Sequence, residues 1–258
     1  MKDPAVAEDL LPDDHPVGTK RICVDMGYYD TYNRDNVSLV NLKKTPIERL
    51  TPRGVQTSTA EYEVDCIVFA TGFDAMTGAL FAMDIRGRGG LGLEEKWADG
   101  PCTYLGIQTV GFPNLYTITG PGSPSVLSNM IISIEQHVDW IADCMTHMRD
   151  TGLDTIEANK DAEDAWVEHV NQVADMTLFP QANSWYVGAN IPGKPRVFMP
   201  YVGGVGPYAQ KCREVVENGY EGLHAVDGRC CRRGPVAAGH QHSFAATHGR
   251  VRQLADPS

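Results

Sequence analysis

Two adjacent cations, Lys20 and Arg21, stand at the start of a short apolar run that predicts a buried strand over residues 21–25. An arginine guanidinium stays charged at any working pH, so it can stabilise an oxyanion in a dry pocket, where a lysine could lose its proton. From composition alone, a solvated strand edge that balances Asp13 and Asp14 is the simpler interpretation. The pair is therefore a candidate anion site that needs support from other elements.

Three further pieces have the residue types of a cofactor or substrate site. Residues 120–130 form a Gly/Pro/Ser loop before a predicted helix, and the unpaired NH groups at a helix start favour negative groups and electron-rich rings. Trp185 and Tyr186 stand in an irregular polar loop, where exposed rings often stack on planar ligands. Residues 65–74 read as a strand that ends in a small-residue loop. The structural alternatives stay open for all three: a capped turn, a packed loop and a sheet crossing.

A glycine pattern at residues 87–92 matches GxGxxG. A dinucleotide site needs this pattern directly after a buried strand and at the head of a helix, with an acidic residue about 20 positions further on. The region about 20 residues past Gly92 is Gly-Phe-Pro-Asn, at residues 111–114, and it has no carboxylate. We therefore predict a glycine-rich turn here and not a phosphate cradle.

Other apparent sites are better explained without catalysis. Ser123 and Ser125 lie in a tight loop but not in a GxSxG elbow, and His137 falls inside a predicted helix, where a satisfied, partly buried histidine is expected. The last part of the chain also has side chains that could hold zinc: Cys230, Cys231, His240, His242 and His248. Their spacing matches no usual zinc module, so we predict no metal site.

The pattern of apolar residues predicts an α/β chain with long helices. Residues 66–70 and 115–119 are apolar runs that each end in a small-residue loop, which is typical of buried central strands. A long helix should end before Gly152 and be capped by Ser125 or Ser128. Its predicted apolar face is Ile131, Ile134, Val138, Ile141 and Met145. Shorter elements are expected as a helix at 28–34, a strand at 37–41, a hairpin over 47–57, and helices at 161–176 and 208–217.

Composition limits the functional class. The 258 residues are 42% hydrophobic with a formal net charge of −11, which disfavours nonspecific binding to nucleic acid or an anionic membrane. No run approaches the roughly 20 apolar residues of a membrane helix, and the acidic start is unlike a secretory signal, so we expect a cytoplasmic protein. The seven scattered cysteines predict reduced thiols. Residues 222–258 carry a net charge of +3 and four of the eight histidines, and we expect them to be disordered.

Four segments together resemble the Baeyer–Villiger flavin monooxygenases. They are GTKRICVDMGYYDTYNRDNV at 18–37, DCIVFATGFDAMTGAL at 65–80, FPNLYTITGPGSPSVLSNMIISIEQHVDW at 112–140 and SWYVGANIPGKPRVF at 184–198. Many flavoproteins share the ATGFD strand and loop, whereas the full set in this order is specific to the family. The similarity runs almost without gaps from about residue 3 to residue 222.

The resemblance implies a flavoprotein with two dinucleotide-binding domains of Rossmann type, for FAD and NADPH, and a helical insertion. Residues 1–60 would end the NADPH-binding domain, and residues 61–221 would form the C-terminal part of the FAD-binding domain, with long helices. Residues 222–258 would be a disordered tail outside the family. The family's glycine loops would lie upstream of Met1, so we expect a missing N-terminal half to be needed for cofactor binding and this chain to be inactive alone.

The resemblance also implies roles for individual residues. Arg21 matches the arginine that lies over the flavin, and it would be the catalytic residue. Lys20 matches a residue that contacts the NADPH phosphate, Trp185 one near the nicotinamide nucleotide, and Met130 one at the flavin. The residues that match the wall of the substrate pocket are Ser125, Val126 and Leu127. An apolar wall suits a hydrophobic ketone.

The implied reaction uses molecular oxygen to insert one oxygen atom beside a ketone carbonyl, which gives an ester or a lactone. Two alternatives stay open. One is a flavin monooxygenase that oxidises nitrogen or sulfur. The other is a non-catalytic remnant or interaction module that exposes core surface where a partner half should dock.

Overall fold

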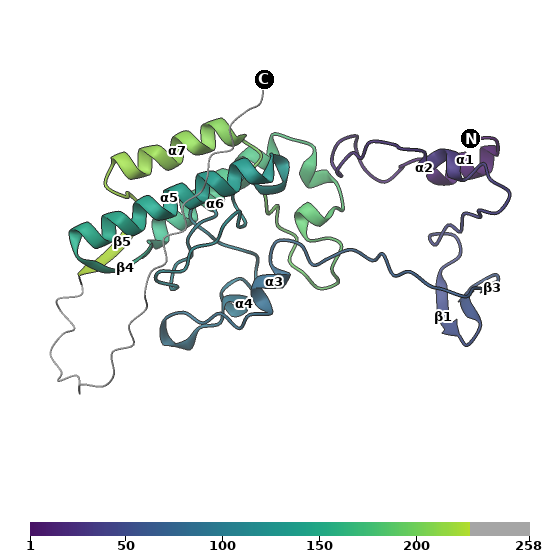
Figure 1. Cartoon of the computed structure of the whole chain (residues 1–258), viewed down its shortest axis with the longest axis horizontal. Coiled ribbons are helices and arrows are strands. Elements are labelled where there is room, and N and C mark those ends of the chain that lie inside the picture. Colours follow the sequence, from purple (N-terminus) through teal and green to yellow (C-terminus); the bar gives the residue numbers. More distant parts are fainter. Residues whose placement is uncertain (228–258) are drawn as a thin grey trace, which may run out of the picture.

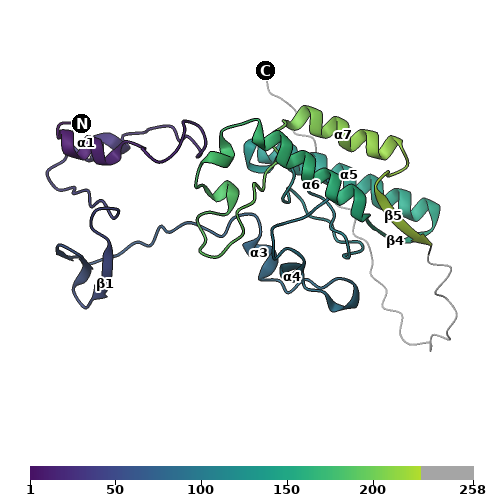
Figure 2. The ribbon, with the colours of Figure 1, turned by 180° about the vertical axis from the view of Figure 1, so that it is seen from behind.

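The computed structural model describes residues 1–227, which form a helical body at one end and an extended arm at the other (Figure 1; seen from behind in Figure 2). We call residues 1–70 the arm, which carries only short elements, and residues 71–227 the body. The body carries the long helices. Among the described residues, no helix has both the length and the hydropathy that a membrane crossing requires.

Three long helices form the body: α5 (Met130–Thr151), α6 (Lys160–Asp175) and α7 (Val205–Glu217). A two-stranded antiparallel sheet, β4 (Leu153–Ala158) with β5 (Leu223–Asp227), lies at one end of them (Figure 1). The three predicted helices are confirmed. Part of the tail expected to be disordered from residue 222 is ordered, because β5 pairs with β4; the rest of that tail lies outside the described residues.

Short polar and glycine residues fix the ends of α5. The Asn129 side chain accepts a hydrogen bond from the Ile131 amide at 3.0 Å, and Gly152 ends the helix at a φ of 73°. The C-cap is as predicted, whereas the predicted N-cap at Ser125 or Ser128 is wrong. Asn129 occupies the cap position, while the Ser128 hydroxyl donates to the Ser125 carbonyl within the preceding turn and the Ser125 hydroxyl contacts the Met76 sulfur.

The buried face of α5 differs from the predicted one. The buried side chains are Ser133, His137, Trp140 and Cys144. The predicted core residues Ile131, Val138 and Met145 are exposed. The reason is that α5 turns its aromatic and small polar face toward α7: the Trp140 Nε1 donates to the Cys212 carbonyl at 3.2 Å.

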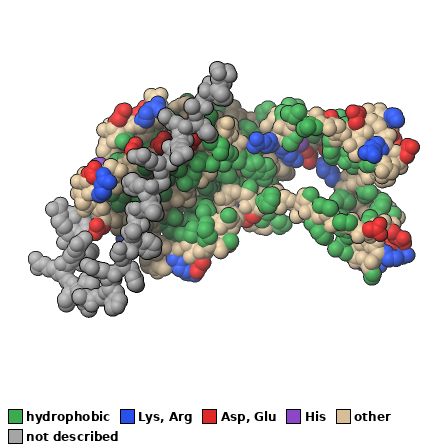
Figure 3. Space-filling model, viewed as in Figure 1, with side chains coloured by type: hydrophobic (Ala, Val, Ile, Leu, Met, Phe, Trp, Pro, Cys, Tyr) green, Lys and Arg blue, Asp and Glu red, His purple; other side chains and the backbone are tan. Residues whose placement is uncertain are grey.

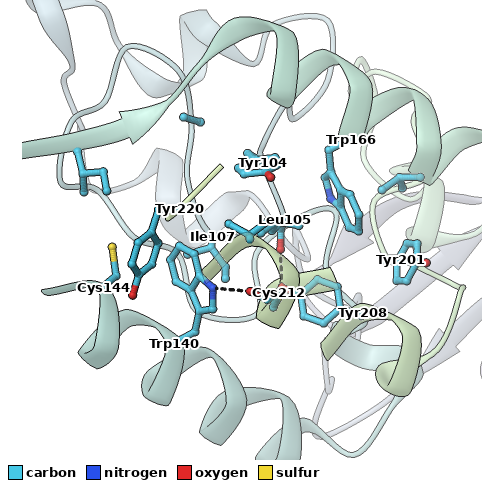
Figure 4. Packing of buried hydrophobic residues seen from close by; sticks show 14 residues of the cluster. Tyr104, Leu105, Ile107, Trp140, Cys144, Trp166, Tyr201, Tyr208, Cys212 and Tyr220 are labelled. Carbon is cyan, nitrogen blue, oxygen red and sulfur yellow. Dashed lines mark hydrogen bonds between the residues drawn. The ribbon is translucent and has the colours of Figure 1, made fainter. Parts of the chain in front are cut away.

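Aromatic side chains make up much of the core between the helices (Figure 4). The rings of Trp166 and Tyr201 lie 5.3 Å apart, and those of Tyr201 and Tyr208 lie 6.0 Å apart. The Tyr208 hydroxyl donates to the Leu105 carbonyl at 2.5 Å, so the polar ends of these rings are also bonded. Such a core is rigid, and it supports the loop that enters α5.

The arm holds two short helices, α1 (Pro4–Leu10) and α2 (Tyr28–Thr31). It also holds a three-stranded antiparallel sheet of β1 (Ile47–Thr51), β2 (Gly54–Thr57) and β3 (Glu61–Glu63). The predicted short helix and hairpin are confirmed, because both depend on residues close in sequence.

Four predicted strands are wrong: residues 21–25, 37–41, 66–70 and 115–119 have no regular structure. Two of these runs, residues 21–25 and 66–70, are exposed, with Val24 at 89%, Val68 at 83% and Phe69 at 70%, and hydrophobic side chains lie on the surface of the arm (Figure 3). An apolar run becomes a strand only when a neighbouring strand supplies hydrogen bonds, and the two described sheets pair other segments. These apolar runs therefore expose surface that needs a cover.

The glycine pattern at residues 87–92 forms a tight turn, as predicted. It contains one turn of 3-10 helix, η1 (Arg88–Gly90). It lies between two one-turn helices, α3 (Gly78–Phe81) and α4 (Leu93–Lys96). A Cβ at Gly87 would lie 2.3 Å from the Gly111 carbonyl oxygen, so the glycine allows a close packing contact. The pattern is thus structural.

Candidate functional site

The guanidinium of Arg21 reaches the Gly–Pro loop, which we define as residues 120–128. Its Nη1 donates to the Val126 carbonyl at 3.5 Å, across 105 positions of sequence. Tyr186 is also close: burial raises the pKa of its phenol, and the positive charge of Arg21 acts in the opposite direction. Among residues 1–227 this exposed side chain has the Val126 carbonyl as its one polar partner, so its other N–H groups can bind an anion.

The Gly–Pro loop has a strained and tightly packed backbone. Ser125 is buried at a φ of 31°, and its hydroxyl contacts the Met76 sulfur at 3.9 Å. Gly122 has a φ of 86°, and its carbonyl accepts the Trp166 Nε1 proton at 3.0 Å. The loop is therefore fixed on the aromatic core on one side while its other side meets Arg21.

An apolar wall follows the strained serine. Val126 and Leu127 are half-buried and pack against a cluster whose buried members are Ala174, Tyr186, Val187 and Phe198. Trp185 packs against the same cluster, with its ring centroid 4.1 Å from that of Tyr186. Five predicted site residues thus meet in one place: Arg21, Ser125, Val126, Leu127 and Trp185.

The other two predicted site residues are less closely tied to this place. Lys20 directs its Nζ to Asp14 at 3.4 Å and has no recorded bond to the Gly–Pro loop. Met130 is half-buried at the first position of α5, directly after the loop. The described residues therefore group the predicted pocket wall with Arg21 and Trp185 more firmly than with Lys20 and Met130.

Residues that the sequence did not single out connect the loops. We call residues 184–198 the tryptophan loop and residues 70–74 the ATGFD loop. Lys194 of the tryptophan loop forms an ion pair with Asp74 and donates to the Ala75 carbonyl at 2.9 Å. Asn190 donates to the Phe73 carbonyl at 3.0 Å. No local pattern pairs residues about 120 positions apart; the single available signal was the presence of both in segments that resemble one family.

His137 is a satisfied core histidine, as predicted. Its Nδ1 accepts the Thr119 amide at 2.9 Å, and its Nε2 lies 2.7 Å from the Tyr208 hydroxyl (Tyr208 appears in Figure 4). Burial lowers the pKa of the imidazole to about 4, so the ring is neutral at physiological pH. His137 therefore stabilises the fold and is not exposed to substrate.

The site offers groups that could hold a flat, negatively charged cofactor. Among residues 1–227 no cluster of histidine, cysteine and carboxylate side chains could hold a metal, and the zinc candidates of the tail lie outside the described residues. Arg21 offers an exposed guanidinium at the Val126 carbonyl, and the half-buried Trp185 packs on the same cluster as Val126. These groups fit a ring with an anionic oxygen or phosphate.

Comparison with known proteins gives a consistent answer, although no protein-family model matches the chain. The chain is 46% identical over 224 residues to a Baeyer-Villiger monooxygenase of Pseudooceanicola batsensis, covering 86% of this chain and 40% of that protein. It is 40% identical over 224 residues to a cyclohexanone 1,2-monooxygenase of Acinetobacter sp, with 86% and 40% covered. It is also 42% identical over 224 residues to a phenazine N-monooxygenase of Lysobacter antibioticus, with 86% and 41% covered.

The solved structures that resemble this chain are also monooxygenases. An oxidised steroid monooxygenase bound to NADP is 52% identical with a TM-score of 0.81, covering 88% of this chain and 43% of that chain. A closed crystal structure of cyclohexanone monooxygenase is 39% identical with a TM-score of 0.84, covering 88% and 42%.

By its fold, the chain therefore matches part of the structures of α/β flavoprotein monooxygenases. Within that class, the chain belongs to the Baeyer–Villiger monooxygenases. It spans about two fifths of the length of the curated relatives that it matches.

Proposed function

We propose that this chain supplies the oxygen-transfer and substrate-facing part of an FAD- and NADPH-dependent monooxygenase, which converts a small hydrophobic ketone into an ester or lactone. The contact between Arg21 and the Val126 carbonyl supports this most, because it sets a permanent cation beside an apolar wall. The bound flavin would supply the reduced ring that activates molecular oxygen.

Arg21 is the proposed catalytic residue. Its guanidinium holds the negative charge that develops on the transferred oxygen, and it keeps its proton through the whole reaction. The carbonyl of Val126 orients the guanidinium by accepting one of its five N–H groups, which leaves the other four for the reacting anion. A charge held in this way is most effective where water is excluded.

Ser125, Val126 and Leu127 are the proposed wall of the substrate pocket. Val126 and Leu127 offer apolar surface to a ketone, and the buried Ser125 fixes the backbone from which they project. Arg21 is bonded to the backbone carbonyl of Val126, which is part of this wall. A ketone bound against the wall would therefore have its carbonyl carbon close to the cation.

Lys20, Trp185 and Met130 are the proposed cofactor contacts. Lys20 would bind the NADPH phosphate in exchange for its long contact with Asp14, which is exposed and so cheap to break. The half-buried Trp185 would pack on the nicotinamide side, and Met130 would contact the flavin.

Cofactor anchoring would come from polypeptide beyond this chain. The single GxGxxG match is a turn, and the apolar runs at 21–25 and 66–70 are exposed and unpaired. We propose that residues 1–60 complete an NADPH-binding domain and that residues 61–221 complete an FAD-binding domain. The exposed stripe of α5, with Ile131 and Val138, would be covered in the same assembly.

The test is to express the chain alone and together with the part of the Pseudooceanicola batsensis relative that it does not match. We expect the chain alone to be colourless and unable to oxidise NADPH. The pair should bind FAD and convert cyclohexanone to its lactone. A yellow, NADPH-consuming protein made of this chain alone would contradict the proposed division of roles.

Oxidation of nitrogen is the second candidate, because the phenazine N-monooxygenase is as similar to the chain as the ketone-oxidising relatives are. The same assembled pair decides between them when it is offered a cyclic ketone and a phenazine in separate reactions. Lactone as the main product supports ketone oxidation, and an N-oxide as the main product replaces it.

A non-catalytic interaction module is the third candidate, and the exposed apolar surface is its support. Such a module would associate through that surface yet give no product with any added half.

The chain's thiols in the described part are free, and Cys144 and Cys212 are buried, which fits the reducing cytoplasm where we place the protein.

A further inference from the structure

An ion pair between Lys194 and Asp74 fastens the tryptophan loop to the ATGFD loop. The Lys194 side chain is 10% exposed and that of Asp74 is 38% exposed. The same ammonium donates to the Ala75 carbonyl at 2.9 Å, so its protons are used by one short segment. Because the lysine end is nearly buried, the pair is screened less than one between two exposed side chains, and removing Asp74 would leave the ammonium unpaired there.

A second side chain makes the same connection. Asn190 donates from Nδ2 to the Phe73 carbonyl at 3.0 Å, so two side chains of the tryptophan loop reach the ATGFD loop. These contacts span 117 and 120 positions of sequence. Two tethers of different chemistry between the same two loops restrict both sliding and rotation.

Glycines leave room for the pair on both sides. A Cβ at Gly78 would lie 2.7 Å from the Asp74 Cβ, and a Cβ at Gly188 would lie 3.2 Å from the Lys194 Cγ. Gly188 also has a φ of 71°, which disfavours any other residue. Both loops thus have small residues where the ion pair approaches their backbones.

The pair lies between the proposed cofactor side and the proposed substrate side. On one side the tryptophan loop carries Trp185, whose ring packs on Tyr186. On the other side the segment after Asp74 carries Met76, whose sulfur contacts the Ser125 hydroxyl. Through these contacts the two sides of the site share one support.

We propose that Lys194 and Asp74 are positioning residues, which hold Trp185 and the wall at residues 125–127 in a fixed relative placement. Neither residue touches the reacting atoms. The proposal rests on the proposed function only for what Trp185 and the wall bind; the tether itself is a property of this chain.

Hydrogen exchange and fluorescence of the chain test this. The variants are Lys194→Met, Asp74→Asn, Lys194→Arg and the charge-swapped double variant with Lys194→Asp and Asp74→Lys. The matched control is Arg196→Met, which removes a cation from the same loop but cuts a bond to Asn183 instead of to the ATGFD loop. The emission of Trp185 is taken as the difference from the Trp185→Phe chain.

We expect Lys194→Met and Asp74→Asn to speed exchange of the Ala189 and Met199 amides, which close the tryptophan loop at 3.1 Å and 2.9 Å. An increase of at least about tenfold, or about 1.4 kcal/mol, and a red shift of Trp185 emission are expected. Lys194→Arg, the charge swap and Arg196→Met should keep both values near those of the unmodified chain.

Unchanged exchange in Asp74→Asn overturns the proposal, and this variant alone decides if Lys194→Met does not fold. The proposal is also overturned if the charge-swapped variant exchanges these amides as fast as the single variants do. It is overturned equally if Arg196→Met speeds their exchange by the same factor. Because no flavin or NADPH is present, these results are separate from the proposed function, which the assembled pair tests through its product.

Discussion

Arg21 and Val126 lie 105 positions apart in sequence, yet the Arg21 Nη1 donates to the Val126 carbonyl at 3.5 Å. The bond joins the arm to the body, and it does so at the loop whose side chains form the apolar wall. A cation and an apolar wall in contact are what a reaction needs when a neutral ketone gains negative charge.

The first prediction concerns Arg21 itself. In the assembled pair, Arg21→Ala should lower oxygenation of the ketone by at least about 100-fold, because the developing charge loses its donor. Reduction of the flavin by NADPH should persist, and product analysis beside stopped-flow flavin absorbance would show the split. Arg34→Ala, which removes an exposed cation from the same arm, is the control and should change neither rate. Loss of both half-reactions in Arg21→Ala would reassign this residue to cofactor binding.

The second prediction concerns the shape of the Gly–Pro loop. Gly122→Ala should destabilise the chain, since the residue has a φ of 86° and its new Cβ would lie 2.9 Å from the Thr103 Oγ1. Gly111→Ala is the matched control: its φ is 89°, but no atom lies within 4 Å of the new Cβ. The control reports the backbone strain alone, so Gly122→Ala should lose about 1–2 kcal/mol more in urea unfolding, from overpacking. Equal losses would show that the close approach to Thr103 does not matter.

The third prediction concerns acid stability. Burial lowers the pKa of His137 to about 4 from the ordinary value of 6.5, so between these values the unfolded chain binds the proton that the folded chain excludes. Stability from this group is therefore complete above pH 6.5 and is lost as the pH falls toward 4, by about 3 kcal/mol in total.

Urea unfolding of His137→Gln over that pH range measures the effect. The glutamine does not titrate, so the variant should lose less stability on acidification than the unmodified chain, although it starts less stable. His169→Gln, which changes an exposed histidine, should keep the full acid sensitivity. An unchanged slope in His137→Gln would refute the assignment.

The fourth prediction concerns the exposed apolar runs. Without a partner half the chain should self-associate, since Val68 is 83% exposed and Phe69 is 70% exposed in an extended, unpaired segment. Val68→Glu should shift the chain toward monomer in sedimentation velocity. Val17→Glu is the control, because Val17 is 90% exposed but lies outside these runs. Identical sedimentation of the two variants would show that association uses another surface.

The helices, the hairpin and the glycine-rich turn could be predicted from the sequence, because each depends on residues close together along the chain. The period of α6 and α7, Gly152 at the end of α5 and the Pro-Arg turn between β1 and β2 are local signals of this kind. The predicted strands were wrong because a strand depends on hydrogen bonds from a distant segment, which an apolar pattern alone does not specify.

Some features of the candidate site could likewise be predicted from the sequence, and others depend on the tertiary structure. The sequence by itself determined its ingredients: a permanent cation at Arg21, a Gly–Pro loop with apolar side chains, and the adjacent aromatic pair Trp185 and Tyr186. The tertiary structure decided which of them meet, namely Arg21 with Val126 and Lys194 with Asp74, and which face of α5 is buried. These contacts cross more than 100 positions of sequence, so they follow from how the body packs and not from any local propensity.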